Sequence, residues 1–147
     1  MFKHILVPTD GSPTALKAAR AAIRLAAAVG ARVTAIHAID ASQPLIYGEA
    51  YASDARTFVD FERAARESGA RQVGAVGRLA KAARVPFASL VAKARTPYEG
   101  IVDAARRKKC DLIFIASHGR HGLSLLVMGS VTQKVLAHAT VPVLVYR

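Results

Sequence analysis

Two short segments of the sequence carry residue types that could bind an anion. The first, "VPTDGS" at 7–12, places Asp10 directly after an apolar run, and the second, "ASHG" at 116–119, follows another apolar run. Gly129 then precedes a helix that the pattern predicts to begin at residue 130. The first N–H groups of a helix have no acceptor within it, and with the positive end of the helix dipole they bind anions such as phosphate. The spacing therefore indicates a loop that could hold a phosphate group.

Each of these features also has a structural explanation that needs no ligand. Ser130 with Gln133 three residues later fits a capping box, and Asp10 could stabilise a turn. Two common phosphate-binding signatures, the P-loop and the GxGxxG fingerprint, are absent from the sequence. Taken singly these residues are more simply structural, but their conjunction favours a binding site.

Histidines near this loop raise the question of a metal site. His118 and His121 flank Gly119, and His37 lies near another predicted strand end. Zinc sites recruit cysteine or carboxylate partners at recognisable spacings, and the sequence has no such set. We therefore expect His118 to position a phosphate or the loop itself rather than to bind a metal.

Enzymatic chemistry has weaker support than binding. Phosphoryl transfer requires cations that neutralise charge, a metal, and a group that orients the nucleophile. Asp10 and Arg120 could contribute, but the sequence has neither a Walker-type lysine nor an evident base. Ser117 and Ser130 have no convincing serine, histidine and acid order. We expect no catalytic residues and a slow ATPase activity at most.

The candidate residues depend on strands and helices that alternate along the chain. Short apolar runs predict strands at 4–8, 31–39, 85–93, 110–116 and 141–146. Helical spacing predicts helices from Pro13 to an end at Gly30, and at 54–84, 97–109 and 130–138. Alternation of this kind predicts an α/β fold, an open doubly wound parallel sheet with helices on both faces, in one domain spanning 1–147. Ligands of such sheets bind outside the carboxyl ends of the strands, which is where Asp10 and the "ASHG" segment fall.

Several local signals refine these elements. Ser12 before Pro13 predicts an N-cap, and "TPYE" at 96–99 predicts a capping box. Gly69 lies in the middle of the long predicted helix, where a bend or break is conceivable because glycine weakens helices. The polar segment 40–53 predicts a long loop, and loops of that length are often functional.

The composition limits the class of protein. The chain has 147 residues and 52% hydrophobic residues, enough for a buried core, and no apolar run approaches the roughly 18 residues that span a bilayer. We therefore expect no membrane partner. Cys110 is the sole cysteine, so no disulfide can form within the chain, and a reducing cytoplasm is the simpler expectation.

The formal net charge of +11 suggests a polyanionic partner as one alternative. The basic residues are spread along the sequence with few aromatic residues among them, which favours a solvated surface over a nucleic-acid site. The run 106–109, with four consecutive cations, is interpreted as the end of a helix, where cations complement the helix dipole.

The loop residues resemble a known family. "ASHG", nine further residues and "GS" are similar to the nucleotide-binding signature of the universal stress protein family, which runs glycine, two residues, glycine, nine residues, glycine, serine or threonine. Gly119, Gly129 and Ser130 match this pattern, and Ala116 replaces the first glycine. "ILVPTDGS", "AIHAID" and "VPVLVYR" extend the resemblance over the whole chain, as do its length and element order.

This resemblance implies a sheet of order 3-2-1-4-5 and a site for ATP or another adenine nucleotide, with Mg²⁺ held through the nucleotide near Asp10. It also implies a stress-response role and a homodimer formed through Val141 to Arg147. The positions matched to the nucleotide site are Pro8, Thr9, Asp10, Ala38, Ala116, His118, Gly119, Gly129, Ser130, Val131 and Thr132. The main hypothesis is thus a nucleotide-dependent regulator, and the alternative is a basic nucleic-acid-associated or protein-interaction module that binds no nucleotide.

Overall fold

The computed structural model describes residues 1–42, 55–119 and 128–147, and for residues 55–58 it describes the backbone alone. Arg120, His121 and all but the first three residues of the predicted loop 40–53 lie outside this part of the chain.

The described chain alternates strands and helices, as predicted. Its elements are β1 (His4–Pro8), α1 (Pro13–Val29), β2 (Arg32–Asp40), α3 (Ala55–Ala82), β3 (Phe87–Ala94), α4 (Pro97–Arg107), β4 (Leu112–Ala116), α5 (Ser130–His138) and β5 (Val143–Tyr146). The strands pair in parallel in the order β3-β2-β1-β4-β5. The predicted doubly wound α/β fold and the order 3-2-1-4-5 are therefore confirmed.

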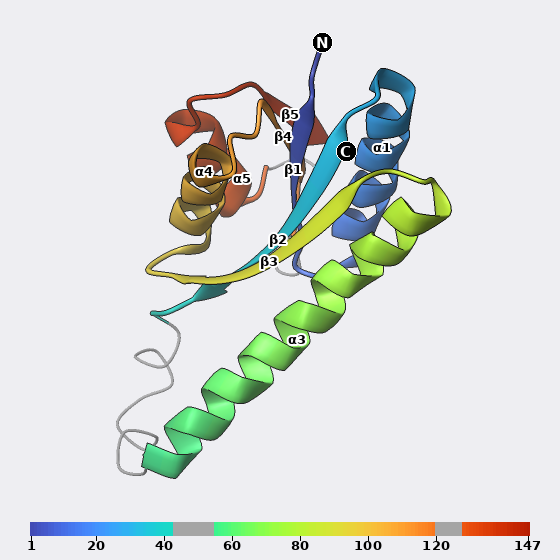
Figure 1. Cartoon of the computed structure of the whole chain (residues 1–147). Helices are drawn as coiled ribbons and strands as arrows, with labels where there is room; N and C mark the ends of the chain where they lie inside the picture. The colour runs from blue at the N-terminus through green and yellow to red at the C-terminus, as the bar shows by residue number, and fades with distance from the viewer. Residues whose placement is uncertain (43–54, 120–127) are drawn as a thin grey trace.

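Helices cover both faces of the sheet (Figure 1). α1 and α3 lie on one face, and α4 and α5 lie on the other. Successive residues of β1 point to opposite faces, because side chains alternate along a strand: Ile5 and Val7 join the core under α1 and α3, and Leu6 joins the core under α4 and α5. All five residues of β1 and of β4 are buried, as in central parallel strands covered on both faces.

The first helix has the two ends that its sequence predicts. The Ser12 side chain accepts a hydrogen bond from the Ala15 N–H at 3.1 Å, which caps the amino end of α1. Gly30 ends the helix in the left-handed region with φ 68°. The chain therefore leaves α1 at Gly30 and enters β2, which pairs with β1.

The long helix α3 is continuous over 28 residues, so the break considered near Gly69 is wrong. A Cβ at Gly69 would lie 2.8 Å from His37 Cδ2, and one at Gly77 would lie 2.9 Å from Phe87 Cε1. These glycines let α3 approach β2 and β3 closely. Their effect on helix propensity is therefore offset by packing.

Three predicted strands begin two residues later than expected, at residues 87, 112 and 143, and for β3 and β4 the ends of the preceding helices explain the difference. The Val85 N–H donates to Ala80 O and the Cys110 N–H donates to Ala105 O, each at 2.9 Å. The residues just before them, Arg84 and Lys109, have φ of 56° and 54°. Residues 85 and 110 therefore complete helix ends of the left-handed type before β3 and β4 start.

The predicted capping box at 96–99 is confirmed in part, and the one at Ser130 is wrong. Thr96 is the N-cap of α4, and its side chain makes no cap bond. The Glu99 carboxylate accepts a hydrogen bond from the Thr96 backbone N–H and also pairs with Arg95 at 2.6 Å. The N-cap of α5 is Gly129 rather than Ser130, and Gln133 Nε2 donates to the carbonyl of Met128 at 2.8 Å. The first turn of α5 is therefore left without a side-chain cap.

Candidate functional site

The ends of β1 and β4 lie side by side at one edge of the sheet. β1 pairs with β4 through Ile5 and Leu112 and through Leu6 and Ile113, and it pairs with β2 on its other side. The chain leaves the neighbouring ends of β1 and β4 toward opposite faces, into α1 and α5 respectively. This is the switch point at which open parallel sheets bind their ligands.

The turn after β1 is held by its own polar groups. The Thr9 N–H donates to Ile36 O at 2.9 Å, which ties the turn to β2. The Gly11 N–H donates to Thr9 Oγ1 at 3.2 Å, and the Ser12 N–H donates to Asp10 Oδ1 at 3.0 Å. Gly11 has φ 76°, a conformation that favours glycine. These contacts fix the carboxylate of Asp10 at the start of α1.

Asp10 and Gly119, far apart in sequence, lie against each other. A Cβ added to Gly119 would lie 2.5 Å from Asp10 Oδ2, far closer than any side chain permits. Glycine at 119 is therefore required for the carboxylate to keep its position. The structure thus places Asp10 opposite the "ASHG" segment, as the family resemblance implies.

The beginning of α5 is anchored on the end of β4. The Gly129 N–H donates to Ser117 O at 2.8 Å, and Thr132 Oγ1 donates to Ala116 O at 2.9 Å. The first amide bonded within the helix is that of Gln133, which donates to Gly129 O at 3.0 Å. The preceding amides, 130–132, therefore have no acceptor within α5, as is usual for the first amides of a helix.

Gly129 is tightly enclosed, whereas Ala116 is easily accommodated. A Cβ at Gly129 would lie 3.2 Å from Ser117 O, a contact closer than almost all Cβ atoms make. Ala116 is the last residue of β4, and its methyl group is buried in the core under α1 and α3. Because strand backbone is extended, alanine at this position needs no positive φ.

Two histidines contact the residues around the site. Ser117 Oγ and His118 Nδ1 lie 2.8 Å apart, within the half-buried loop after β4. His37 Nδ1 donates to the carbonyl of Thr9 at 2.9 Å. The sequence prediction missed this second contact, although the position of His37 directly before Ala38 at the end of β2 could have suggested it.

The remaining predicted site residues lie farther along the sheet edge. Pro8 ends β1, is buried, and pairs with Ile36. Ala38 lies two residues beyond that pair on β2, half-buried, on the face covered by α4. A Cβ added to Gly100 of α4 would come within 3.2 Å of the Ala38 methyl group.

The described residues contain no group of three or more histidine, cysteine or acidic side chains that could hold a metal ion. Burial raises the pKa of the Cys110 thiol to about 11, so this thiol stays protonated at neutral pH.

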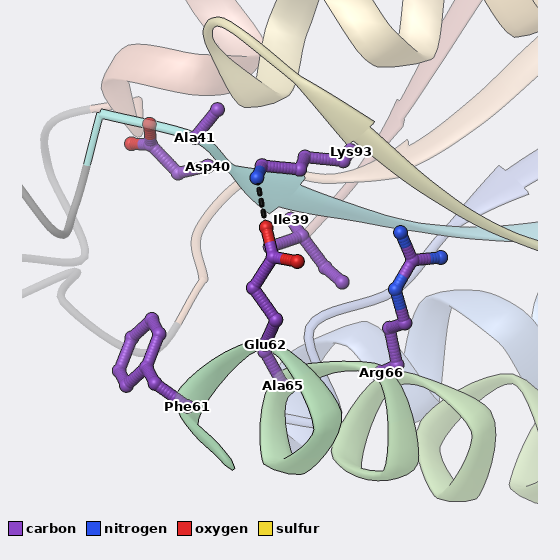
Figure 2. A pocket seen from close by; sticks show the side chains of 8 residues that line it. All are labelled: Ile39, Asp40, Ala41, Phe61, Glu62, Ala65, Arg66 and Lys93. Atoms are coloured by element: carbon purple, nitrogen blue, oxygen red, sulfur yellow. Dashed lines mark hydrogen bonds and ion pairs between the residues drawn. The ribbon is translucent and has the colours of Figure 1, made fainter. Parts of the chain in front are cut away.

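Two surface hollows lie away from these residues. One lies between the carboxyl end of β2 and α3, where Glu62 of α3 points to Lys93 of β3 and pairs with it (Figure 2). The other lies between the end of β3 and the start of α4. Neither hollow includes a residue of the predicted nucleotide site.

The described part of the chain has no helix long and apolar enough to cross a membrane.

Comparisons with known proteins place this arrangement in a family. The model of the universal stress protein family matches residues 1–147. A universal stress protein of Thermus aquaticus is 34% identical over 147 residues, which cover 100% of both chains. The solved structure of a universal stress protein family member from Burkholderia pseudomallei is 29% identical, with a TM-score of 0.76 over 99% of this chain and 96% of that chain.

Two more distant structures were solved with nucleotides. One is a universal stress protein in complex with cAMP, 23% identical over 99% of this chain and 97% of that chain, with a TM-score of 0.65. The other, from Archaeoglobus fulgidus in complex with dAMP, is 17% identical over 100% of this chain and 98% of that chain, with a TM-score of 0.60. These two share the fold. On its match over the full length and its fold, the chain belongs to the universal stress protein family.

Proposed function

We propose that the protein binds an adenine nucleotide, ATP first among them, at the adjoining ends of β1 and β4. The observation that carries the proposal is the contact of the Asp10 carboxylate with Gly119, beside a helix start with three amides that have no acceptor within α5. A side chain at Gly119 or at Gly129 would fill space that the site leaves open. The residues present therefore fit a phosphate-bearing ligand.

Each part of the site has a role in this proposal. The N–H groups of Ser130, Val131 and Thr132 would hold the phosphates, as amides at a helix start do. Asp10 would lie near the ribose and a nucleotide-bound Mg²⁺, which would neutralise phosphate charge. The edge formed by Pro8, Thr9 and Ala38 would receive the base. The relatives solved with cAMP and dAMP support adenine as the base to test first.

The described residues of the site offer N–H groups that would bind phosphate, but no group placed to activate a nucleophile. Binding is therefore the proposed activity, and ATP hydrolysis would be slow. We further propose a cytoplasmic regulator of the stress response whose nucleotide state alters its association with partners. Its homodimer would form through β5.

Calorimetric titration of nucleotide-free protein with Mg²⁺ and ATP tests the proposal, with GTP as the control for the base. Gly119→Ala should weaken ATP binding at least about tenfold, because its Cβ displaces the Asp10 carboxylate. Gly129→Val should do the same by forcing the start of α5 away from Ser117. Gly74→Ala is the matched control, since a Cβ there meets nothing within 4 Å.

The variants separate the possible outcomes. Binding lost in the two site variants and kept in Gly74→Ala supports the proposal, provided that circular dichroism shows all three folded. Wild-type protein that takes up no ATP, or a folded Gly119→Ala variant with unchanged affinity, would overturn it.

A further inference from the structure

Two long stretches of this chain contain no acidic residue. Between residues 11 and 39, and again between 68 and 98, the sequence has no aspartate or glutamate. The first stretch contains α1 and the second contains the carboxyl-terminal half of α3. Both stretches still carry lysine and arginine. The net charge of +11 is therefore concentrated in particular elements.

The fold brings these two elements together. α1 and α3 cover the same face of the sheet and share one core, in which Val76 and Ala80 of α3 pack with Ala19 and Ala22 of α1. The side chains opposite that core face outward. Six exposed cations lie there, and we call them the basic face: Lys17, Arg20 and Arg24 on α1, and Arg71, Arg78 and Lys81 on α3. Charge that is dispersed in sequence is thus gathered in space.

The basic face has no acidic partner in the part of the chain that the structure describes. Among the residues that the structure describes, none of its six cations forms an ion pair. Arg106 and Arg107 at the end of α4 provide a contrast, because they reach Asp103 at 2.8 and 3.7 Å. Unscreened positive charge on one layer of helices produces a local field that attracts polyanions.

The dimensions of the basic face suit a nucleic-acid duplex. At 1.5 Å per residue, the cations of α1 span about 10 Å and those of α3 span about 15 Å. Packed helices lie about 8–10 Å apart, so the two rows form a patch that covers several phosphates of a duplex with a 3.4 Å rise. Four of the six cations are arginines, whose planar guanidinium groups bind phosphate through two hydrogen bonds.

Other polyanions fit this surface less well. Single strands are bound by aromatic side chains that stack on bases, and residues 11–39 and 68–86 contain no aromatic residue besides the ring of His37. Membrane-surface helices insert large apolar residues, and the exposed large hydrophobic side chains that the structure describes lie outside these two stretches. We propose that the basic face binds the phosphate backbone of double-stranded nucleic acid, independently of sequence. This activity is separate from the nucleotide site and does not depend on it.

Fluorescence anisotropy with a short labelled DNA duplex of mixed sequence, between about 50 and 200 mM KCl, tests this proposal. The wild-type protein should bind in the micromolar range at the low end, with affinity falling steeply as salt rises. The variant Lys17→Gln, Arg20→Gln, Arg24→Gln should bind at least about tenfold more weakly. The salt slope, which is the slope of log K against log salt concentration, should decrease in magnitude by about two to three, since each lost phosphate contact removes about 0.9. The variant Arg71→Gln, Arg78→Gln, Lys81→Gln should behave alike.

The matched control removes the same number of charges from the other layer. Arg106→Gln, Arg107→Gln, Lys108→Gln should keep the wild-type affinity within about twofold and most of the salt slope. All substituted residues are exposed, so circular dichroism and ATP titration should be unchanged in every variant. An equal loss of duplex affinity in the control variant would overturn the proposal. A wild-type protein that does not bind the duplex would also overturn it, whether or not it binds phosphatidylserine vesicles.

Discussion

His37 links the second strand to the turn that carries Asp10. Because a carbonyl oxygen only accepts hydrogen bonds, Nδ1 carries the proton in its 2.9 Å contact with Thr9 O. The N–H of Thr9 is already held by Ile36 O, so β2 fixes both backbone groups of this residue. Gly69 of α3 leaves the space for the imidazole ring. The position of the Asp10 carboxylate therefore depends on a residue that need not touch the ligand.

His37→Ala should weaken ATP binding about two- to tenfold, the net value of one hydrogen bond, by releasing the Thr9 carbonyl. His37→Asn, whose amide can donate at nearly the same place, should recover part of the affinity. Calorimetry on both variants, with thermal melts as the control for folding, gives the measurement. If both variants bind as tightly as the wild type, the turn does not need this contact.

Asp111 makes the stability of the fold depend on pH. Burial alone would raise the pKa of its carboxyl group, but the N–H groups of His4 and Lys3 donate to it at 2.9 and 2.8 Å and hold the pKa below the ordinary value of 3.8. A pKa lowered by folding gives stability that is present above the unfolded value and is lost as pH falls through the folded value. Asp111→Asn should thus lower the melting temperature at neutral pH, and the difference from the wild type should shrink below about pH 4. A difference that stays constant down to strongly acidic pH would contradict this account.

At the scale of elements, α3 shows how packing overrides helix propensity. Its glycines are of two kinds: Gly77 faces Phe87 of β3, where a Cβ would lie 2.9 Å from Cε1, and Gly74 faces open space. Sequence periodicity alone treats these positions alike. The contact with the sheet distinguishes them.

Gly74→Ala should raise the free energy of unfolding by about 0.5–1 kcal/mol, because alanine favours the helix and meets nothing there. Gly77→Ala should lower it by about 1–3 kcal/mol, the usual cost of overpacking, because the new methyl group pushes against the Phe87 ring. Urea unfolding of the two variants at neutral pH compares them directly. Equal shifts of the same sign would show that α3 does not pack against β3 as closely as the structure has it.

At the scale of the whole molecule, the open edge of β5 is the surface on which a homodimer would form. Among the described strands, β5 ends the sheet and pairs only with β4, and it exposes 37% of Leu144. An edge strand with apolar side chains pairs readily with another chain. In a two-fold dimer, both copies use the same surface patch, so one substitution alters both sides of the interface.

Leu144→Asp should therefore shift the protein from dimer to monomer in size-exclusion chromatography with light scattering. Val59→Asp on α3 is the matched control, since Val59 is also exposed and α3 packs on β2 and β3, whereas β5 lies at the other end of the sheet. A dimer that persists in Leu144→Asp and dissociates in Val59→Asp would place the interface on α3 instead.

The sequence by itself determined the class of fold, most element positions and the family. Periodicity of apolar residues, the cap at Ser12 and the glycine at residue 30 are local signals, and the structure confirms each of them. The loop motif with Gly119 and Gly129 was equally legible, because glycine at fixed spacing requires no knowledge of neighbours. Local signals failed where a partner decided the outcome, as at the side chain of Thr96, at Gln133 and in the continuous helix through Gly69.

Only the tertiary structure decided which distant residues meet. The approach of Asp10 to Gly119 and the bond from His37 to Thr9 arise because β1 lies between β2 and β4, an order that composition and periodicity do not encode. The basic face has the same origin, since its two helices are separated by a strand and a long segment of chain. Hydrophobic patterning states which side of an element is buried, whereas the packing of whole elements against one another fixes which exposed charges become neighbours.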